Sequence, residues 1–333
     1  MRTPHSYFPL PPLPFSHYTL AHGHMHRNRH RRNPPACGAV RPRRKHAPGI
    51  RKVDTRQPGR SPEEALFALV ESIWPQEGRV SAIAAACPGP VNRARGILHT
   101  APNIPEWQEY PLAEHLQARF GVPAAIDNDA NLAALGEWRF GAGQGHHHIL
   151  YLTVSTGIGG GIIMDDHLLH GAHGLAGELG HLTILPNGPV CGCGQRGHLE
   201  AVASGTAIAR QVRAALEAGS PSRMSLNPPP TTREIAQAAA EGDSLAQEAL
   251  SQAGTYLGVA LADYLHVFNP TCLIIGGGVA RSGDVLLQPL QDALRTHVMS
   301  PRYLDDLVVT TAALEDNAGL LGALVLAQQV TSP

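Results

Sequence analysis

Four side chains that can bind a metal ion lie between positions 181 and 198 of this chain: His181, Cys191, Cys193 and His198. Two thiolates and two imidazoles suit a tetrahedral zinc ion that keeps no open coordination position. The Cys-x-Cys spacing is tighter than that of zinc fingers, but the glycines around it let the backbone turn sharply enough. The alternative is a glycine-rich loop with two free thiols. A closed set of four ligands would stabilise the local fold and would not activate water.

A second group of polar side chains surrounds the first of these histidines. Zinc bound to one imidazole nitrogen of His181 would fix the direction of the other nitrogen, which could then hydrogen-bond a substrate hydroxyl. Glu178 and Glu200 lie near it in the sequence and could accept hydrogen bonds from further hydroxyls. This arrangement suits a polyol, because each buried hydroxyl needs a partner and an unpaired polar group is costly.

The segment 127–131, Asp-Asn-Asp-Ala-Asn, ends a predicted strand and begins a predicted helix. Ligands of α/β proteins bind at the carboxyl ends of strands, so polar residues here are well placed to meet one. Asp129 could act as a general base that takes a hydroxyl proton, while Asn128 orients the same substrate. The alternative is helix capping, for which Asp and Asn are common. Only one of the three polar residues at 127–129 is needed as a helix cap, so the presence of the other two favours a functional role.

Two glycine-rich turns also follow predicted strands. The first turn contains Thr156, Gly157, Gly159 and Gly160, and the second contains Gly276, Gly277 and Gly278. Backbone amides without side chains in the way can approach phosphate oxygens closely. The first turn matches neither the P-loop nor the dinucleotide-binding fingerprint. Each could be a tight turn without a ligand, but two such turns in one chain favour a nucleotide bound between them.

The hydrophobic pattern alternates between strands and helices, which predicts an α/β fold. Predicted strands cover 80–87, 123–126, 149–154, 160–164, 271–275 and 307–310. Predicted helices cover 61–74, 111–120, 130–138, 203–218, 231–240, 244–266, 284–297 and 317–328. The first helix has the clearest start, with Ser61 as N-cap, Pro62 in the first helical position and Glu64 placed for a capping box.

Residues 1–60 differ from the rest of the chain. They hold 13 of the 26 Lys and Arg residues and one acidic residue, which leaves 13 basic and 26 acidic residues for 61–333. They are rich in Pro and His and show neither the helical nor the strand period. Three interpretations are a disordered basic arm, a nucleic-acid-binding arm, and a mistranslated segment from a wrong start or a shifted frame. The acidic remainder argues against sequence-independent binding of nucleic acid.

The remaining composition is that of a globular protein of the cytoplasm. A hydrophobic fraction of 43% is enough for a core, and the five cysteines are an odd number in a long chain, which argues against a disulfide framework. No apolar run is long enough for a membrane span, and the N-terminus does not read as a signal peptide.

Together these motifs closely resemble those of the ROK family, which contains bacterial glucokinases, related hexose and N-acetylhexosamine kinases, and sugar-responsive repressors. The signature lies in Gly-Glu-Leu-Gly-His at 177–181 and Cys-Gly-Cys-Gly-Gln-Arg-Gly-His-Leu-Glu at 191–200. Further segments that are similar to family motifs, in family order, are 88–91, 101–107, 128–131, 156–161, 269–270, 274–279, 316–319 and 322–323. The resemblance covers about residues 61–328.

The resemblance implies an actin-like, ribonuclease-H-like fold with two α/β domains and a cleft between them. The N-terminal domain would continue over 61–128 after the basic segment 1–60. The larger C-terminal domain would span 129–316 with the zinc loop at 181–198, and a helix at 317–333 would return to the N-terminal domain. Homodimers or homotetramers are the implied assemblies.

The resemblance also implies ATP-dependent phosphorylation of a hexose, with glucose as the default, at its primary hydroxyl. Asp129 would deprotonate that hydroxyl. The other hydroxyls would be held by Asn103, Asn128, Glu178, His181 and Glu200. The turn 156–161 would hold the phosphates and 276–279 would lie against the adenosine. Mg²⁺ would come with ATP and neutralise the transferring group, and Zn²⁺ would be structural.

The chain departs from the family pattern in two places. The family usually has a third cysteine where this chain has His198, although a Cys2His2 set remains a sound zinc site. Family kinases also begin with a strand and an Asp-x-Gly-Gly-Thr phosphate loop, which 1–60 does not contain. Its loss would leave an incomplete N-terminal sheet with an open edge and would slow phosphoryl transfer greatly. The alternative function is therefore a catalytically impaired sugar-binding protein or a transcriptional regulator.

Overall fold

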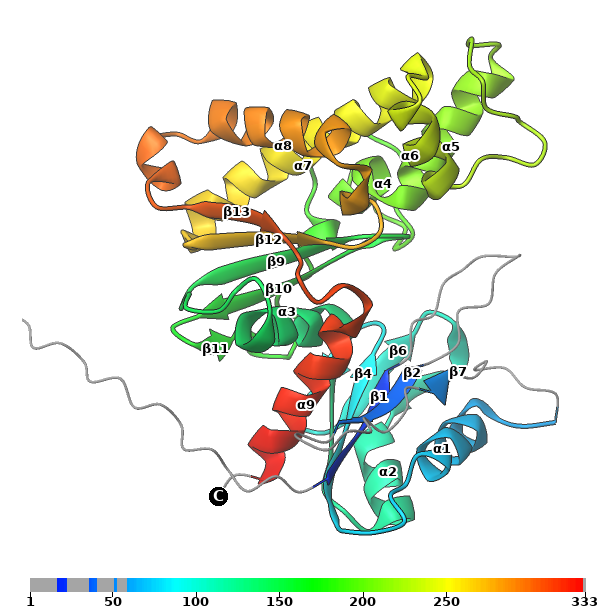
Figure 1. Ribbon diagram of the computed structural model, residues 1–333, viewed down its shortest axis with the longest axis vertical. Coiled ribbons are helices and arrows are strands. Elements are labelled where there is room, and N and C mark those ends of the chain that lie inside the picture. Colours follow the sequence, from blue (N-terminus) through cyan, green and yellow to red (C-terminus); the bar gives the residue numbers. More distant parts are fainter. Residues whose placement is uncertain (1–16, 23–35, 41–50, 53–58, 332–333) are drawn as a thin grey trace, which may run out of the picture.

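The computed structural model describes residues 17–22, 36–40, 51–52 and 59–331, and for the first three ranges only the backbone. The described chain forms two α/β halves, each built on a five-stranded sheet (Figure 1). Two helices, α3 (Asp129–Phe140) and α9 (Ala318–Thr331), form a layer between the sheets. The other helices cover the outer faces.

The N-terminal sheet has the strand order β3-β2-β1-β4-β8. Its strands are β1 (His17–His22), β2 (Ala36–Val40), β3 (Arg51–Lys52), β4 (Val80–Cys87) and β8 (Ala124–Asn128). β4 runs parallel to both β1 and β8. The open edge expected beside β4 is therefore absent from the described sheet, because β1 pairs there. The phosphate-loop prediction concerns 1–60, and the segment that joins β1 to β2, 23–35, lies outside the described residues.

The outer face of this sheet is covered by two helices and a small second sheet. These elements are α1 (Pro62–Ser72), α2 (Leu112–Phe120), β5 (Val91–Asn92), β6 (Ile97–Ala101) and β7 (Ile104–Tyr110). The capping box predicted for α1 is confirmed, since Ser61 N donates to Glu64 Oε2 at 2.8 Å and Glu64 N donates to Ser61 Oγ at 3.2 Å. Leu69, Leu116 and Ile126 are among the side chains that form the core on this side.

The C-terminal sheet has the strand order β11-β10-β9-β12-β13. Its strands are β9 (Ile149–Val154), β10 (Ile158–Met164), β11 (His167–Leu168), β12 (Cys272–Gly276) and β13 (Val308–Thr311). Its outer face is covered by α4 (Leu199–Ala203), α5 (Gly205–Glu217), α6 (Thr232–Ala240), α7 (Ser244–Phe268) and α8 (Asp284–His297). Four 3-10 turns complete the described elements: η1 (Leu179–His181), η2 (Ala280–Ser282), η3 (Pro301–Leu304) and η4 (Glu315–Asn317).

The middle layer holds the two sheets together. α3 and α9 cross backbone to backbone, because a Cβ on Gly322 would lie 1.7 Å from the Leu132 carbonyl oxygen and a Cβ on Gly136 would lie 2.2 Å from that of Ala318. Only glycine fits such a crossing. The side chains of this layer pack on alanines of β4 on one side and on β9 and β12 on the other. Asp129, the first residue of α3, is thereby fixed relative to both sheets.

The predicted elements agree closely with the observed ones. β4, β9 and α8 have the predicted bounds, and the other predicted helices and strands are present with ends that differ by a few residues. The strands β1, β2 and β3 were not predicted, because 1–60 shows no strand period in its sequence, so that interpretation of the segment was wrong for these residues. The three-stranded sheet β5-β6-β7, the short β11 and the short α4 were not predicted either. None of the helices within the described ranges is long and apolar enough to cross a membrane.

Candidate active site

Asp129 stands where β8 passes into α3. The helix cap is its neighbour Asn128, whose side-chain oxygen accepts from the amides of Ala130 at 2.9 Å and Asn131 at 3.2 Å. The Asn128 amide nitrogen donates to the Gly89 carbonyl at 3.1 Å, which ties the end of β8 to the turn after β4. Asn128 thus does the capping that was the alternative for this segment. One oxygen of the half-buried Asp129, Oδ1, also accepts from the Ala130 amide at 2.9 Å.

Glu178 and His181 come from the other half of the molecule. His181 ends the 3-10 turn η1, and Glu178 is the residue just before that turn. Glu178 as a residue is exposed, but partial burial of its carboxyl group raises its pKa. His181 lowers this pKa, while the carboxylates of Asp129 and Glu200 raise it further. Glu178 therefore lies within electrostatic reach of His181, Asp129 and Glu200, which come from two regions of the chain.

Glu200 connects this group to the first glycine turn. It is the second residue of α4, and its Oε2 accepts a hydrogen bond from Ile158 N at 3.0 Å. A Cβ on Gly157 would lie 2.4 Å from the same oxygen, so glycine is required where this carboxylate meets the turn. The Cys191 thiol lies 3.4 Å from the other oxygen, Oε1. Glu200 therefore touches both the glycine turn and the metal-ligand cluster.

The predicted zinc ligands lie together. Suitable atoms of His181, Cys191, Cys193 and His198 are all within 4.8 Å of one another. The two Nδ1 atoms are 3.3 Å apart, Cys191 Sγ is 3.6 Å from His181 Nδ1, and Cys193 Sγ is 3.3 Å from His198 Nδ1. Zinc bonds of about 2.0–2.3 Å at tetrahedral angles require ligands about 3.3–3.8 Å apart. The residues present fit a zinc ion, and with Nδ1 of His181 in this cluster its Nε2 faces elsewhere.

The two glycine turns follow neighbouring parallel strands, β9 and β12. Ser155, Thr156 and Gly157 form the first turn, and the start of α5 lies against it, since Gly205 N donates to the Ser155 carbonyl at 2.7 Å. Gly277 has a φ of +89° and a Cβ there would lie 2.2 Å from the Val154 carbonyl oxygen, so this second turn presses on the end of β9. A Cβ on exposed Gly278 would meet nothing within 4 Å.

Gly159 and Gly160 are in strand β10 rather than in the turn. A Cβ on Gly159 would lie 2.9 Å from the Ala130 side chain, and one on Gly160 would lie 2.5 Å from that of Leu179. These glycines let α3 and η1 approach the sheet closely, which explains them without a ligand. Within 156–161, the turn proper is therefore Thr156 and Gly157.

Asn103 lies in the turn between β6 and β7. The ring of the preceding residue, Pro102, lies against Gly89, because a Cβ on Gly89 would be 3.3 Å from that ring. The carbonyl of Gly89 also accepts the hydrogen bond from Asn128. The described contacts thus connect this turn to the end of β8 through Gly89.

One residue that contacts this region, Tyr264, was missed from the sequence. It is buried in α7, and its hydroxyl donates to the Leu179 carbonyl at 2.5 Å, within η1. The signal that could have found it is a polar aromatic side chain on the buried, otherwise aliphatic face of the helix predicted at 244–266.

Comparison with known proteins gives a consistent result. A family model described as "ROK family" matches residues 48–330. The glucokinase of Thermotoga maritima is 41% identical over 246 residues, which are 71% of this chain and 75% of that protein. The DNA-binding transcriptional repressor Mlc of Escherichia coli is 31% identical over 248 residues, which are 74% of this chain and 61% of the repressor.

A solved structure supports the same grouping. The ROK family glucokinase from Streptomyces griseus, in complex with glucose and AMPPNP, superposes with a TM-score of 0.77 and 32% identity, covering 94% of this chain and 99% of that one. The expected actin-like fold with two α/β domains is thus confirmed.

Proposed function

Because this chain belongs to the ROK family, we propose that it transfers the terminal phosphoryl group of ATP to the primary hydroxyl of a hexose, with glucose as the first candidate. The observation that carries this proposal is that Glu178 lies within electrostatic reach of Asp129, Glu200 and His181, because one base near several hydroxyl-binding groups suits a polyol substrate. Its relatives include glucokinases, one of which was solved with glucose and AMPPNP.

Asp129 would act as the general base. As the hydroxyl oxygen forms its bond to the γ-phosphorus, the hydroxyl proton passes to the Asp129 carboxylate. The bond between that phosphorus and the bridging oxygen breaks, and ADP leaves with the electron pair. The Asn128 cap and the crossing of α3 with α9 hold Asp129 in place, which matters because phosphoryl transfer depends on positioning.

Glu178, His181 and Glu200 would hold the remaining hydroxyls, together with Asn103 and Asn128. Glu200 Oε2 accepts from Ile158 N and Oε1 lies 3.4 Å from the Cys191 thiol, so a substrate hydroxyl would share this carboxylate with those two groups. Zinc bound by His181, Cys191, Cys193 and His198 would cross-link the loop after η1 and fix the His181 ring.

The nucleotide would lie along the turns that follow β9 and β12. Thr156 and Gly157 would contact the phosphates and 276–279 the adenosine, where exposed Gly278 leaves room for a flat ligand. Magnesium that arrives with ATP would supply charge neutralisation for the transferring group. Because Glu200 bonds to Ile158 directly after the first turn, one carboxylate would set the sugar and phosphate sites relative to each other.

A coupled assay of ADP release tests the proposal on the full chain, with glucose, mannose, fructose, allose and N-acetylated amino sugars as acceptors. Asp129→Asn is expected to lower kcat by about 10²–10⁴-fold while calorimetry without ATP still detects sugar binding. Asp166→Asn, on an exposed loop at the opposite end of β9, is the control and should leave kcat unchanged.

The second candidate is a sugar-binding protein or regulator without catalysis. It is favoured by the similarity to the repressor Mlc and by the lack of an Asp-x-Gly-Gly-Thr sequence in 1–60. Sugar binding in calorimetry without ADP release for any hexose would reject the kinase proposal in favour of this one. The nucleotide sequence upstream of codon 61, translated in all three frames, would show whether the phosphate loop is encoded in a neighbouring frame.

A further inference from the structure

A buried carboxylate that the proposed chemistry does not use lies two residues before Asp129. Asp127 is 2% exposed at the end of β8, and both of its oxygens are engaged. Oδ1 accepts from the Asn128 amide at 2.8 Å and from the Asn131 side chain at 3.2 Å, in the first turn of α3. Oδ2 lies 2.8 Å from His170 Nε2 and 3.9 Å from an Arg93 nitrogen.

The partners of Asp127 come from three other parts of the fold. Arg93 follows β5, and its guanidinium also lies 3.3 Å from His170 Nε2 and donates to Gln329 Oε1 of α9 at 2.8 Å. His170 Nε2 cannot both donate to Asp127 and accept from Arg93. The distance from His170 Nε2 to the Asp127 carboxylate is the shorter of the two, which indicates that this nitrogen donates to Asp127. The Arg93 guanidinium then balances the buried negative charge of Asp127.

His170 opens the segment that leads to Glu178. Its carbonyl accepts from Ala176 N at 3.0 Å, so residues 170–176 form a closed loop that ends two residues before Glu178. The loop is pressed against β5, because a Cβ on Gly174 would lie 2.6 Å from the Val91 carbonyl oxygen. The loop thus meets the N-terminal half at two points, the Asp127 carboxylate and the Val91 carbonyl.

We propose that Asp127, His170 and Arg93 form a brace that sets the spacing between Asp129 and Glu178, and that they are positioning residues for sugar phosphorylation. Asp127 fixes the start of α3 through Oδ1 and the loop before Glu178 through Oδ2, so one carboxylate connects the proposed base to a proposed sugar-binding group. The inference rests on the proposed kinase function for its kinetic consequence, but the contact between the two halves is independent of it.

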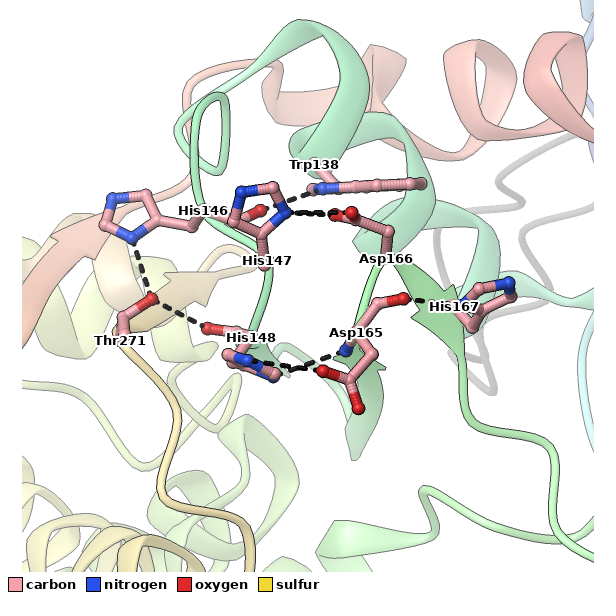
Figure 2. Close-up of polar contacts among 8 residues, drawn as sticks. All are labelled: Trp138, His146, His147, His148, Asp165, Asp166, His167 and Thr271. Atoms are coloured by element: carbon pink, nitrogen blue, oxygen red, sulfur yellow. Dashed lines mark hydrogen bonds and ion pairs between the residues drawn. The ribbon is translucent and has the colours of Figure 1, made fainter. Parts of the chain in front are cut away.

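The same chain contains a matched pair without this connection (Figure 2). His147 Nδ1 lies 2.7 Å from Asp166 Oδ1, a separation close to that of His170 and Asp127. The two side chains are 50% and 48% exposed, against 21% and 2% for the brace pair. They join the segment before β9 to the turn between β10 and β11, at the far end of the sheet from the glycine turns. Any effect common to His–Asp pairs should appear at both places.

The test compares Asp127→Asn, His170→Ala and the double variant with Asp166→Asn and His147→Ala. The Asn side chain has one oxygen only, so it cannot accept from α3 and from His170 at once. We expect kcat/KM for the sugar to fall about 10- to 100-fold in each brace variant, with the KM for ATP within about twofold of the wild type. The double variant should lose no more than the larger single loss, because both changes break one unit. The control pair should change nothing beyond about twofold.

Hydrogen exchange of the sugar-free protein gives a readout that needs no turnover. Amides of 171–178 are expected to exchange at least about tenfold faster in Asp127→Asn and His170→Ala, while those of 149–164 stay as in the wild type. Unchanged exchange in 171–178, additive losses in the double variant, or equal effects of the control pair would overturn the brace. If the wild-type protein phosphorylated no hexose, only the kinase proposal would be contradicted. The hydrogen-exchange result would still show whether Asp127, His170 and Arg93 form the brace.

Discussion

A single buried hydroxyl holds the turn that carries Glu178 and His181. Tyr264 is 1% exposed, burial raises the pKa of its phenol, and the hydroxyl donates to the Leu179 carbonyl. Tyr264→Phe leaves that carbonyl with only the longer contact from Leu182 N, at 3.4 Å. The lost hydrogen bond should cost about 0.5–1.5 kcal/mol in the free energy of unfolding. We expect this loss in urea unfolding, with a raised sugar KM and a smaller change in kcat. Tyr303→Phe, whose hydroxyl makes only a 4.0 Å contact to a Met299 sulfur, is the control; equal stability of the two variants would contradict the role of Tyr264.

Glu178 illustrates a conflict between stability and binding. Its pKa is raised in the folded state, first by burial and then by Asp129 and Glu200. The folded state is therefore favoured below the unfolded pKa of Glu178, and this advantage is lost as pH rises through the folded pKa. Glu178→Gln should raise Tm more at about pH 8 than at about pH 5, while weakening sugar binding about tenfold or more. Differential scanning calorimetry and sugar titration measure both, and a lower Tm at both pH values would contradict the prediction.

Among the elements, the segment from η1 to α4 is the one that the proposed zinc ligands would stabilise most. Apart from the two short bridges Thr183–His198 and Val190–Arg196, the described residues 182–198 contain no regular helix or strand. A chelator or Cys193→Ala should remove zinc, unfold this segment and raise the sugar KM, because zinc binding free energy stabilises such loops directly. His198→Cys should retain about one zinc per chain, since thiolate replaces imidazole in a tetrahedral site. Metal analysis by mass spectrometry decides between these outcomes, and full zinc content in Cys193→Ala would contradict the site.

Local signals were sufficient to predict most elements. The capping box at Ser61, the apolar run of β4 and the glycines after β12 each specify their element within a few residues. The sheet β5-β6-β7 could not be predicted in the same way. β5 has two residues, and β7 alternates poorly, with exposed residues in adjacent pairs at Pro105–Glu106 and Gln108–Glu109. These strands are stabilised by pairing with one another and by packing on β4. The intrinsic strand propensity of their residues does not report such contacts.

The candidate site was predictable where ligands lie close in sequence and not where they meet only in space. The cluster at 181–198 follows from residue types and spacing. The contact of Asp127 with His170 joins residues 43 apart, and that of Arg93 with Gln329 joins residues 236 apart. Nothing in the local pattern distinguishes His170 from the histidines at 146–148. From the sequence, Asp127 was one of three polar residues at the end of a predicted strand. Only its burial and its contacts in the structure distinguish it from Asn128 and Asp129.

At the scale of the whole molecule, the layer of α3 and α9 is common to both halves. Its side chains pack on β4 and on β12, and its glycines bring the two helices into backbone contact. Asp129, the proposed general base, is the first residue of this layer, and α9 completes it. A change in the middle layer must therefore affect both sheets, so we expect one cooperative unfolding transition for the described fold rather than two.

Glu137 provides the means to test this. It is fully buried in α3, and its carboxylate accepts from Ala142 N at 2.9 Å, from Ala313 N at 3.1 Å and from Leu314 N at 2.8 Å. The last two belong to the segment by which the chain leaves β13 and enters α9. Glu137→Gln keeps the shape but turns an amide N–H2 toward backbone donors, which should lower the free energy of unfolding by about 2–3 kcal/mol.

The same variant should shift the entire unfolding curve in calorimetry and leave it a single transition, because the link that Glu137 holds joins the C-terminal sheet to the shared layer. Glu217→Gln, in an exposed pair with Arg213, should change stability by less than about 1 kcal/mol. If Glu137→Gln instead split the curve, with one half melting at the wild-type temperature, the two sheets would be independent. The middle layer could then not be what holds Asp129 in register with the residues of the C-terminal half.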